Sequence, residues 1–327
     1  GTGSAGMEAA VCNVIEPGDK AIICVNGVFG TRMTDVAGRY GAEVIKVEAP
    51  WGEPIDPAEV KKALDANPDA ALVGIVHAET STGVLQPMEE IGAACQGHGA
   101  LLLMDCVTSL GGVPVEVDKW GVEIAYSGTQ KCLSCPPGVA PLTMSERALG
   151  KMRERKNKVA SWYFDVSMIE SYWGSDRSYH HTGPITMNYA IREALRLVLE
   201  EGLEARFDRH ALASKALQAG VEALGLSMFA QEGARTPTLN TVSIGDNIDD
   251  GAVRKSLLND FNIEIGGGLG PVAGKAWRIG MMGHGARQEN VAYLISALEV
   301  IFKRMGYTQK VGDASAAVTQ VYAEALS

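Results

Sequence analysis

The sequence lacks any cluster of basic residues and any long apolar run. Its 39 Asp and Glu residues outnumber its 29 Lys and Arg residues, which gives a formal net charge of −10 at pH 7. A chain this acidic repels phosphate backbones and anionic headgroups, so we expect neither nucleic acid nor a membrane surface as a partner. The apolar run over residues 100–104 is broken by Asp105, whereas a membrane-spanning helix needs roughly 20 apolar residues.

Cysteine is absent from the second half of the chain. The six cysteines lack the regular spacing of a disulfide framework; they are Cys12, Cys24, Cys95, Cys106, Cys132 and Cys135. In a chain of this size they indicate reduced thiols, several of them in the core. Cys132 and Cys135 have the spacing of a redox pair, but no second Cys or His pair stands near them to complete a zinc site. We therefore expect no metal and interpret both as small residues lining a loop.

We expect no targeting leader either. The chain begins Gly1-Thr2-Gly3, without Met and without a basic and apolar leader. This beginning predicts a cytoplasmic protein and no signal peptide. We also expect that a further N-terminal segment precedes Gly1 in the complete protein.

The first half of the chain predicts an α/β domain. The 327 residues, 46% of them hydrophobic, suffice for two domains with a sizeable core. Short apolar runs alternate with helical patterns, which is typical of a parallel sheet covered on both faces. The expected strands span residues 21–25, 43–47, 71–77, 101–105, 124–127 and 139–144, and the expected helices span 29–40, 57–66 and 88–97. Ligands of such sheets bind outside the carboxyl ends of the strands.

The second half predicts a smaller α+β unit. Long helices are expected at 184–202 and 203–224, then strands at 239–244 and 276–279 and helices at 249–261 and 288–305. We place a large domain at 1–202 and a small domain at 203–306. Residues 307–327 are small and polar, and we expect them to form a loosely attached tail.

The glycine-rich start of the chain suits an anion. Residues Gly1 to Gly6 match the dinucleotide pattern G-x-G-x-x-G, but no strand precedes them and the next strand ends at Asn26 rather than at an acidic residue. An NAD-binding oxidoreductase is therefore the weaker interpretation. A Gly/Ser/Thr loop that opens a helix equally suits a single phosphate, because its free N–H groups and the helix dipole favour an anion.

Asp105 and Lys131 stand at the ends of two expected strands. A buried carboxylate at Asp105 needs a cationic partner. With the anion loop, the pair predicts a pyridoxal 5'-phosphate site, in which the loop holds the phosphate, Lys131 forms an imine and Asp105 keeps the pyridine nitrogen protonated. The alternative interpretation gives Lys131 a surface ion pair and makes Asp105 a helix cap.

Motifs across the chain resemble those of the class V aminotransferases. The residues that carry the resemblance are Asp105-Cys-Val-Thr-Ser-Leu-Gly-Gly, Tyr126-Ser-Gly-Thr-Gln-Lys131, Pro136-Pro137-Gly138, His77-Ala-Glu-Thr-Ser-Thr-Gly83, Tyr179-His-His-Thr182 and Gly266-Gly-Gly-Leu-Gly-Pro271 with Arg278-Ile-Gly280. They occur in family order and spacing from Gly1 to about Met305. The most similar branch is that of the alanine–glyoxylate and serine–glyoxylate (serine–pyruvate) aminotransferases. The resemblance implies a fold type I structure, whose large domain has a mainly parallel seven-stranded sheet flanked by helices.

The resemblance also implies a role for each site residue. Lys131 would be the imine lysine and proton carrier, and Asp105 the partner of the pyridine nitrogen. The further cofactor contacts implied are Thr2, Gly3, Ser4 and Gln130 at the phosphate, Thr80 at the phenolic oxygen, Val107 and Phe29 on the two ring faces, and Tyr179 and Thr182 from a second subunit. Because Tyr179 and Thr182 would come from a second subunit, the site would be shared within a homodimer. Several relatives have Trp where Phe29 stands and His where Ser4 stands, so contacts to the ring would differ in detail.

Arg278 would bind the substrate carboxylate, because its planar guanidinium suits bidentate recognition. The expected reaction is a ping-pong transamination from L-alanine or L-serine to glyoxylate or pyruvate. Ureidoglycine–glyoxylate and 2-aminoethylphosphonate–pyruvate transamination are alternatives that use the same lysine and arginine. Cysteine desulfurases need a mobile cysteine in the second half, which this chain lacks. A non-catalytic binding protein on the same fold conflicts with the intact Lys131, Asp105 and Arg278.

Overall fold

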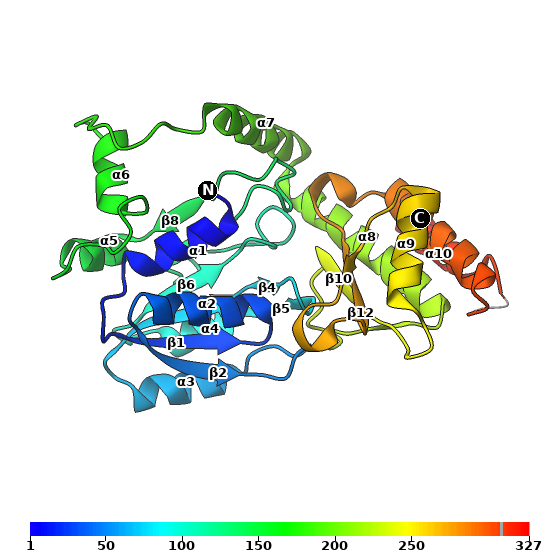
Figure 1. Cartoon of the computed structure of the whole chain (residues 1–327), viewed down its shortest axis with the longest axis horizontal. Coiled ribbons are helices and arrows are strands. Elements are labelled where there is room, and N and C mark those ends of the chain that lie inside the picture. Colours follow the sequence, from blue (N-terminus) through cyan, green and yellow to red (C-terminus); the bar gives the residue numbers. More distant parts are fainter. Residues whose placement is uncertain (308–309, 327) are drawn as a thin grey trace.

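The computed structural model describes residues 1–307 and 310–326. Figure 1 shows two units side by side, an α/β layer structure formed by the first part of the chain and a smaller unit formed by the last part. Helix α7 (Ile185–Glu201) leads from the first unit to α8 (Leu203–Ala223) of the second. The predicted domain boundary at Gly202 lies between these two helices.

The central sheet has six strands in the order β2-β1-β3-β6-β7-β8. They are β1 (Lys20–Val25), β2 (Glu43–Glu48), β3 (Ala70–Val76), β6 (Leu101–Asp105), β7 (Ile124–Tyr126) and β8 (Leu142–Met144). All neighbours pair in parallel except β7 and β8, which are antiparallel. The expected mainly parallel α/β sheet is thus confirmed.

The resemblance implied a sheet of seven strands, and this number is wrong for the described part of the chain, where six strands form the sheet. The sequence itself contains six suitable apolar runs, and each became one strand. The last of them is shorter than expected, since residues 139–141 stay outside β8. A two-stranded hairpin of β4 (Ala78–Glu79) and β5 (Val84–Leu85) was not foreseen.

Helices cover both faces of the sheet. In β1, Ala21 and Ile23 belong to a core shared with α1 (Gly3–Cys12), α2 (Val28–Arg39) and α5 (Glu146–Arg153), whereas Ile22 and Cys24 belong to a core shared with α3 (Pro57–Ala66) and α4 (Met88–Cys95). Successive side chains of a strand point to opposite faces, so a continuous apolar run fills both cores. Asp56 precedes α3 and caps it by accepting the Ala58 N–H at 2.8 Å.

The smaller unit packs helices on an antiparallel sheet. Its strands, in the order β11-β12-β10-β9, are β9 (Ser227–Met228), β10 (Leu239–Ser243), β11 (Gly266–Gly267) and β12 (Ala276–Gly280). Its helices are α8, α9 (Asp250–Phe261) and α10 (Gln288–Arg304), and short 3₁₀ turns span Gly270–Val272 and Gly283–Gly285. Trp277 on β12 is fully buried in this core.

The expected loose tail is wrong for most of its length. Residues Asp313–Ala325 form helix α11, which packs against α8 and α10. Ala314, Val318 and Tyr322 lie on one face of this helix and are buried in the core of the smaller unit. The small residues that suggested a tail are therefore the apolar stripe of an amphipathic helix. Residues 308, 309 and 327, which the prediction also covered, lie outside the described residues.

Helices α6 (Val166–Trp173) and α7 stand apart from the central sheet in Figure 1. They and the adjoining loops expose many large apolar side chains, among them Trp173 at 74%, Tyr189 at 69% and Leu199 at 78%. Exposed apolar surfaces of this extent mark interaction sites. Among the described helices, none is both long and apolar enough to cross a membrane.

Gly220 lies where α8 meets α10 and α11. A Cβ at this position would approach Ile295 and Val318 to 2.8 Å. Because the core is closely packed, we expect Gly220→Ala to lower the free energy of unfolding by about 1–3 kcal/mol. Gly38 of α2 has open space at its Cβ position, so Gly38→Ala should raise this energy by about 0.5–1 kcal/mol. Urea denaturation measures both, and a loss of equal size in the two variants would contradict the packing argument.

Candidate active site

A cavity of about 200 Å³ lies at the carboxyl ends of the parallel strands. The strands β3, β6 and β7 end at Val76, Asp105 and Tyr126, and the chain that follows each of them contributes to the wall. Nine of the twelve site residues expected from the sequence line this cavity: Thr2, Gly3, Ser4, Phe29, Thr80, Asp105, Val107, Gln130 and Lys131. The structure thus brings together segments up to 129 positions apart in one small volume.

The start of α1 forms one end of the cavity. Thr2 precedes the helix and makes no capping hydrogen bond through its side chain, so the first N–H groups remain available to an anion. Gly3 packs directly against Val107, since a Cβ there would come within 2.9 Å of the valine Cγ2. Arg32 Nη1 donates to Ser4 Oγ at 3.1 Å and adds positive charge beside this loop.

Asp105 lies buried in the cavity wall with 3% exposure. Its Oδ1 accepts the Val107 N–H at 2.8 Å, and its Oδ2 accepts the Tyr126 hydroxyl at 2.6 Å. Burial raises the pKa of Asp105 to about 6, while these two hydrogen bonds lower it in part. A buried carboxylate of this kind gains most from a positively charged partner that faces it from the cavity.

Lys131 lines the same cavity, is half-buried, and has no hydrogen-bond partner for its Nζ among residues 1–307 and 310–326. Burial lowers the pKa of its amine, and the positive charge of Arg278 lowers it further. Cys132 and Asp105 act in the opposite direction. A lysine with a lowered pKa is neutral over more of the accessible pH range and can act as a nucleophile or base.

This environment makes the titration of Lys131 a measurable property. In cofactor-free protein we expect its reaction with an acylating reagent to increase with pH around a midpoint below that of ordinary lysines. Arg278→Gln removes one of the two causes, so the midpoint should move upward without reaching the ordinary value, because burial persists. Mass spectrometry of the Lys131 peptide at several pH values provides the midpoint. An unchanged midpoint in Arg278→Gln would exclude the arginine as a cause.

A buried carboxylate positions Phe29. Glu79 Oε2 accepts the N–H groups of Phe29 at 3.0 Å and of Gly30 at 3.3 Å, and its Oε1 accepts the Ser81 hydroxyl at 2.7 Å. These bonds fix the first turn of α2, so the Phe29 ring is held at the cavity. The guanidinium of Arg32 lies 4.8 Å from the centre of this ring.

The three remaining expected residues lie outside the cavity. Arg278 is half-buried on β12, where its Nε donates to Gly267 O at 2.8 Å. Tyr179 is 74% exposed, and its hydroxyl lies 3.1 Å from Thr182 Oγ1. Tyr179 and Thr182 are thus exposed and can contact another molecule, whereas Arg278 lies close enough to Lys131 for its charge to lower the pKa of that amine.

The sequence did not predict Met7, Arg32, Val76 and Ala78 as cavity residues. Arg32 could have been found, because it lies three positions after Phe29 on the same helix, and residues at this spacing share a face. The others are small or apolar residues in strongly apolar segments, which carry no signal that separates a cavity wall from a core.

The chain is similar to known proteins over almost all of its length. The sequence model of the family described as aminotransferase class-V matches residues 1–294. The (S)-ureidoglycine–glyoxylate transaminase of Bacillus subtilis is 42% identical over 99% of this chain and 82% of its own. The alanine–glyoxylate aminotransferase of Drosophila melanogaster is 42% identical over 91% of this chain and 77% of its own. The solved structure of an alanine–glyoxylate aminotransferase from Nostoc sp. superposes with a TM-score of 0.90 and 51% identity over 92% of this chain and 80% of its own.

Proposed function

Because this chain belongs to the class V aminotransferases, and is thus an aminotransferase of fold type I, we propose that it transfers the amino group of L-alanine or L-serine to glyoxylate or pyruvate. The cofactor in this proposal is pyridoxal 5'-phosphate, which the family implies. The observation that carries it is the single cavity in which an anion-binding helix start, a buried carboxylate and a lysine of lowered pKa meet.

The groups in the cavity fit this cofactor chemically. Gly3 and Ser4, at the start of α1, offer N–H groups suited to a phosphate, and Arg32 adds positive charge there. Asp105 offers a buried negative charge suited to a protonated pyridine nitrogen. Lys131 offers a half-buried amine as the attachment point.

In this proposal the residues of the chain have separate tasks. When bound, the cofactor supplies an electron-accepting ring that stabilises negative charge on the substrate carbon. Asp105 would keep the ring nitrogen protonated, Phe29 and Val107 would hold the two faces of the ring, and Thr80 would contact its phenolic oxygen. Lys131 Nζ takes the proton from the substrate carbon and returns one to complete the transfer. Its lowered pKa favours the neutral amine that this task needs.

Arg278 provides recognition of the substrate in this proposal. Every amino acid and keto acid partner has a carboxylate, and a guanidinium binds a carboxylate with two parallel hydrogen bonds. The arginine lies close enough to Lys131 to lower the pKa of its amine. A carboxylate bound to Arg278 would therefore place its neighbouring carbon near the lysine.

Relatives support glyoxylate as the acceptor, since the names of the two proteins compared above both contain it. They differ in the donor. The similarity to the Bacillus subtilis enzyme makes (S)-ureidoglycine a second candidate donor for this chain. The lysine and arginine would serve either donor.

A homodimer is part of the proposal. Tyr179 and Thr182 lie outside the cavity of their own chain, on a face with further exposed apolar residues such as Ile185 at 64% and Tyr189 at 69%. A second copy would cover this apolar face. Tyr179 and Thr182 would then reach the phosphate in the cavity of the partner.

The proposed reaction is tested with purified protein and added pyridoxal 5'-phosphate. L-serine and (S)-ureidoglycine are each offered as donor with glyoxylate and with pyruvate, L-alanine is offered with glyoxylate, and formation of glycine or alanine is measured. We expect transfer from at least one donor with glyoxylate. Absence of transfer in all five combinations would refute the proposal, and a clear preference for (S)-ureidoglycine would make it the donor in place of L-alanine and L-serine.

The shared site is tested by mixing two inactive variants. A dimer of one Lys131→Ala chain and one Tyr179→Ala chain contains one cavity with its lysine and with the tyrosine of the other chain. If Tyr179 acts across the dimer, mixed refolded protein regains about a quarter of the wild-type activity. If Tyr179 acts within its own chain, the mixture stays inactive.

A further inference from the structure

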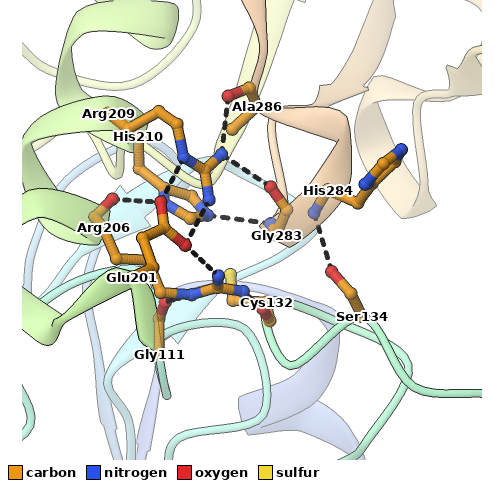
Figure 2. A network of polar contacts seen from close by, with 10 residues as sticks. All are labelled: Gly111, Cys132, Ser134, Glu201, Arg206, Arg209, His210, Gly283, His284 and Ala286. Carbon is orange, nitrogen blue, oxygen red and sulfur yellow. Dashed lines mark hydrogen bonds and ion pairs between the residues drawn. The ribbon is translucent and has the colours of Figure 1, made fainter. Parts of the chain in front are cut away.

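A network of polar contacts joins the two units at the start of α8 (Figure 2). Its centre is Glu201, the last residue of α7. The Glu201 carboxylate accepts Arg206 Nη1 at 2.5 Å through Oε2 and Arg209 Nε at 2.5 Å through Oε1. Both guanidinium groups are partly or fully buried, with 6% and 30% of their side chains exposed. A shared carboxylate in such surroundings orients both arginines.

Arg206 holds the chain next to Lys131. Its Nη2 donates to the carbonyl oxygen of Cys132, the residue that follows the lysine, and its Nε donates to Gly111 O at 2.8 Å. These carbonyl groups belong to the large unit. Arg206 therefore ties the loop that contains Lys131 to the first turn of α8.

Arg209 and His210 hold the chain that follows β12. Arg209 Nη1 donates to Gly283 O at 2.8 Å and to Ala286 O at 2.7 Å. His210 Nδ1 donates to Arg206 O at 2.7 Å, and His210 Nε2 accepts the Gly283 N–H at 2.8 Å. Burial lowers the pKa of His210 to about 4, which keeps Nε2 in the accepting form. Arg278 stands on β12, five positions before Gly283.

The loop that contains Lys131 and the loop that follows β12 are also in direct contact. Ser134 Oγ accepts the N–H of His284 at 2.7 Å. Gly283 has a φ of +54°, and a Cβ there would lie 1.9 Å from Ser134 Oγ. Ser134 itself has a φ of +56°, a conformation that costs a non-glycine residue energy and persists where the surroundings impose it. The loop of Lys131 and the loop after β12 thus meet without free space between them.

We propose that Glu201 is a positioning residue for the substrate, which acts through Arg206 and Arg209 to fix Arg278 relative to Lys131. The inference rests on the proposed function, since it assigns Lys131 and Arg278 to the two ends of one substrate. The carboxylate and the reacting carbon of an amino acid are joined by a single bond, so a small displacement between arginine and lysine separates the bound substrate from its base. The phosphate loop and Asp105 lie outside this network, so their positions are set independently.

The test compares Glu201→Gln with Glu200→Gln in the cofactor-loaded protein. Glu200 is the neighbouring residue on α7 and forms an exposed pair with Arg196, so it is the matched control. We expect Glu201→Gln to raise KM for the amino donor by about tenfold or more, since misplacement by an ångström is costly. Glu200→Gln should leave KM unchanged. Affinity for the cofactor, measured from its absorption, should be similar in all three proteins.

A second measurement does not depend on activity. Propionate has the substrate carboxylate but no reacting group, and its binding to loaded protein can be measured by calorimetry. If Glu201 places Arg278 at the cavity, propionate should bind more weakly to Glu201→Gln than to the wild-type protein. If wild-type protein binds propionate and transfers no amino group, the proposed function fails, while the comparison of propionate affinities still decides the role of Glu201.

Gly283→Ala tests the same idea if Glu201→Gln folds poorly. It separates the two loops by steric contact with Ser134 and leaves all charges in place. We expect the same increase in KM with unchanged cofactor affinity. The inference is overturned if either folded variant keeps the wild-type KM and propionate affinity, or if cofactor affinity falls in parallel with substrate affinity, because a purely structural network would loosen both.

Discussion

Lys131→Ala should abolish amino transfer and the visible absorption of lysine-bound cofactor. Alanine provides neither the attachment point nor the amine that moves the proton between substrate and cofactor. Proton transfer by a positioned side chain contributes about 10²–10⁴-fold to a rate, and loss of attachment adds to this effect. We expect kcat to fall by roughly 10⁴-fold or more. Stopped-flow assays and absorption spectra of the two proteins measure both effects.

The control for this experiment is Lys255→Ala. Lys255 is an exposed lysine on α9, far from the cavity in sequence and in the fold, so its loss should change neither activity nor spectrum. Lys131 is half-buried, and no hydrogen bond from the described residues reaches its amine, so the alanine variant should fold and still bind the phosphate group at the start of α1. A visible band that survives in Lys131→Ala would mean that another amine holds the cofactor, and the assignment would fall.

Asp105→Asn should lower kcat by about 10²–10³-fold, which is the usual effect of removing a charge that stabilises a reacting system in a buried site. Asparagine has nearly the same shape, and its oxygen can still accept a hydrogen bond from the Val107 N–H. It cannot keep a pyridine nitrogen protonated, since it has no negative charge. The electron-accepting capacity of the ring should therefore decline while the cofactor stays bound.

Tyr126→Phe is the comparison that isolates the charge. It removes the hydroxyl that donates to Asp105 Oδ2 at 2.6 Å but keeps the carboxylate. That hydrogen bond lowers the pKa of Asp105, so its loss should raise this pKa further above about 6. A positively charged ring nitrogen facing the carboxylate would favour its charged form, so activity should fall much less than in Asp105→Asn. Equal losses in the two variants would show that geometry at Asp105, rather than its charge, is decisive.

The positions of the chemical groups could be predicted from the sequence because they follow strand ends. Asp105 ends one short apolar run and Lys131 follows the polar turn after another, and the carboxyl ends of parallel strands converge. The family resemblance supplied what spacing could not, above all Phe29 and Thr80. Arg32 was missed although it lies three positions after Phe29 on α2, a spacing that places two residues on one helix face.

The network around Glu201 could not be predicted from the sequence. Arg206 and Arg209 bind backbone carbonyl groups of Gly111, Cys132 and Gly283, and a carbonyl acceptor exists at every residue. Nothing in the sequence marks which of them an arginine will reach. The C-terminal helix was mistaken for a tail for a different reason, since alanine and threonine can form either a polar surface or a small-residue packing face.

The buried carboxylate of Glu79 gives the cavity a built-in reporter. Its oxygens accept the amide protons of Phe29 and Gly30, which lie about 50 positions away in sequence, and the side chain has no contact with water. Amides bonded in this way exchange with solvent only when the surrounding structure opens. In deuterated buffer the exchange of these two amides would therefore record how often the cavity wall opens, in cofactor-free and loaded protein alike, without any assay of the reaction.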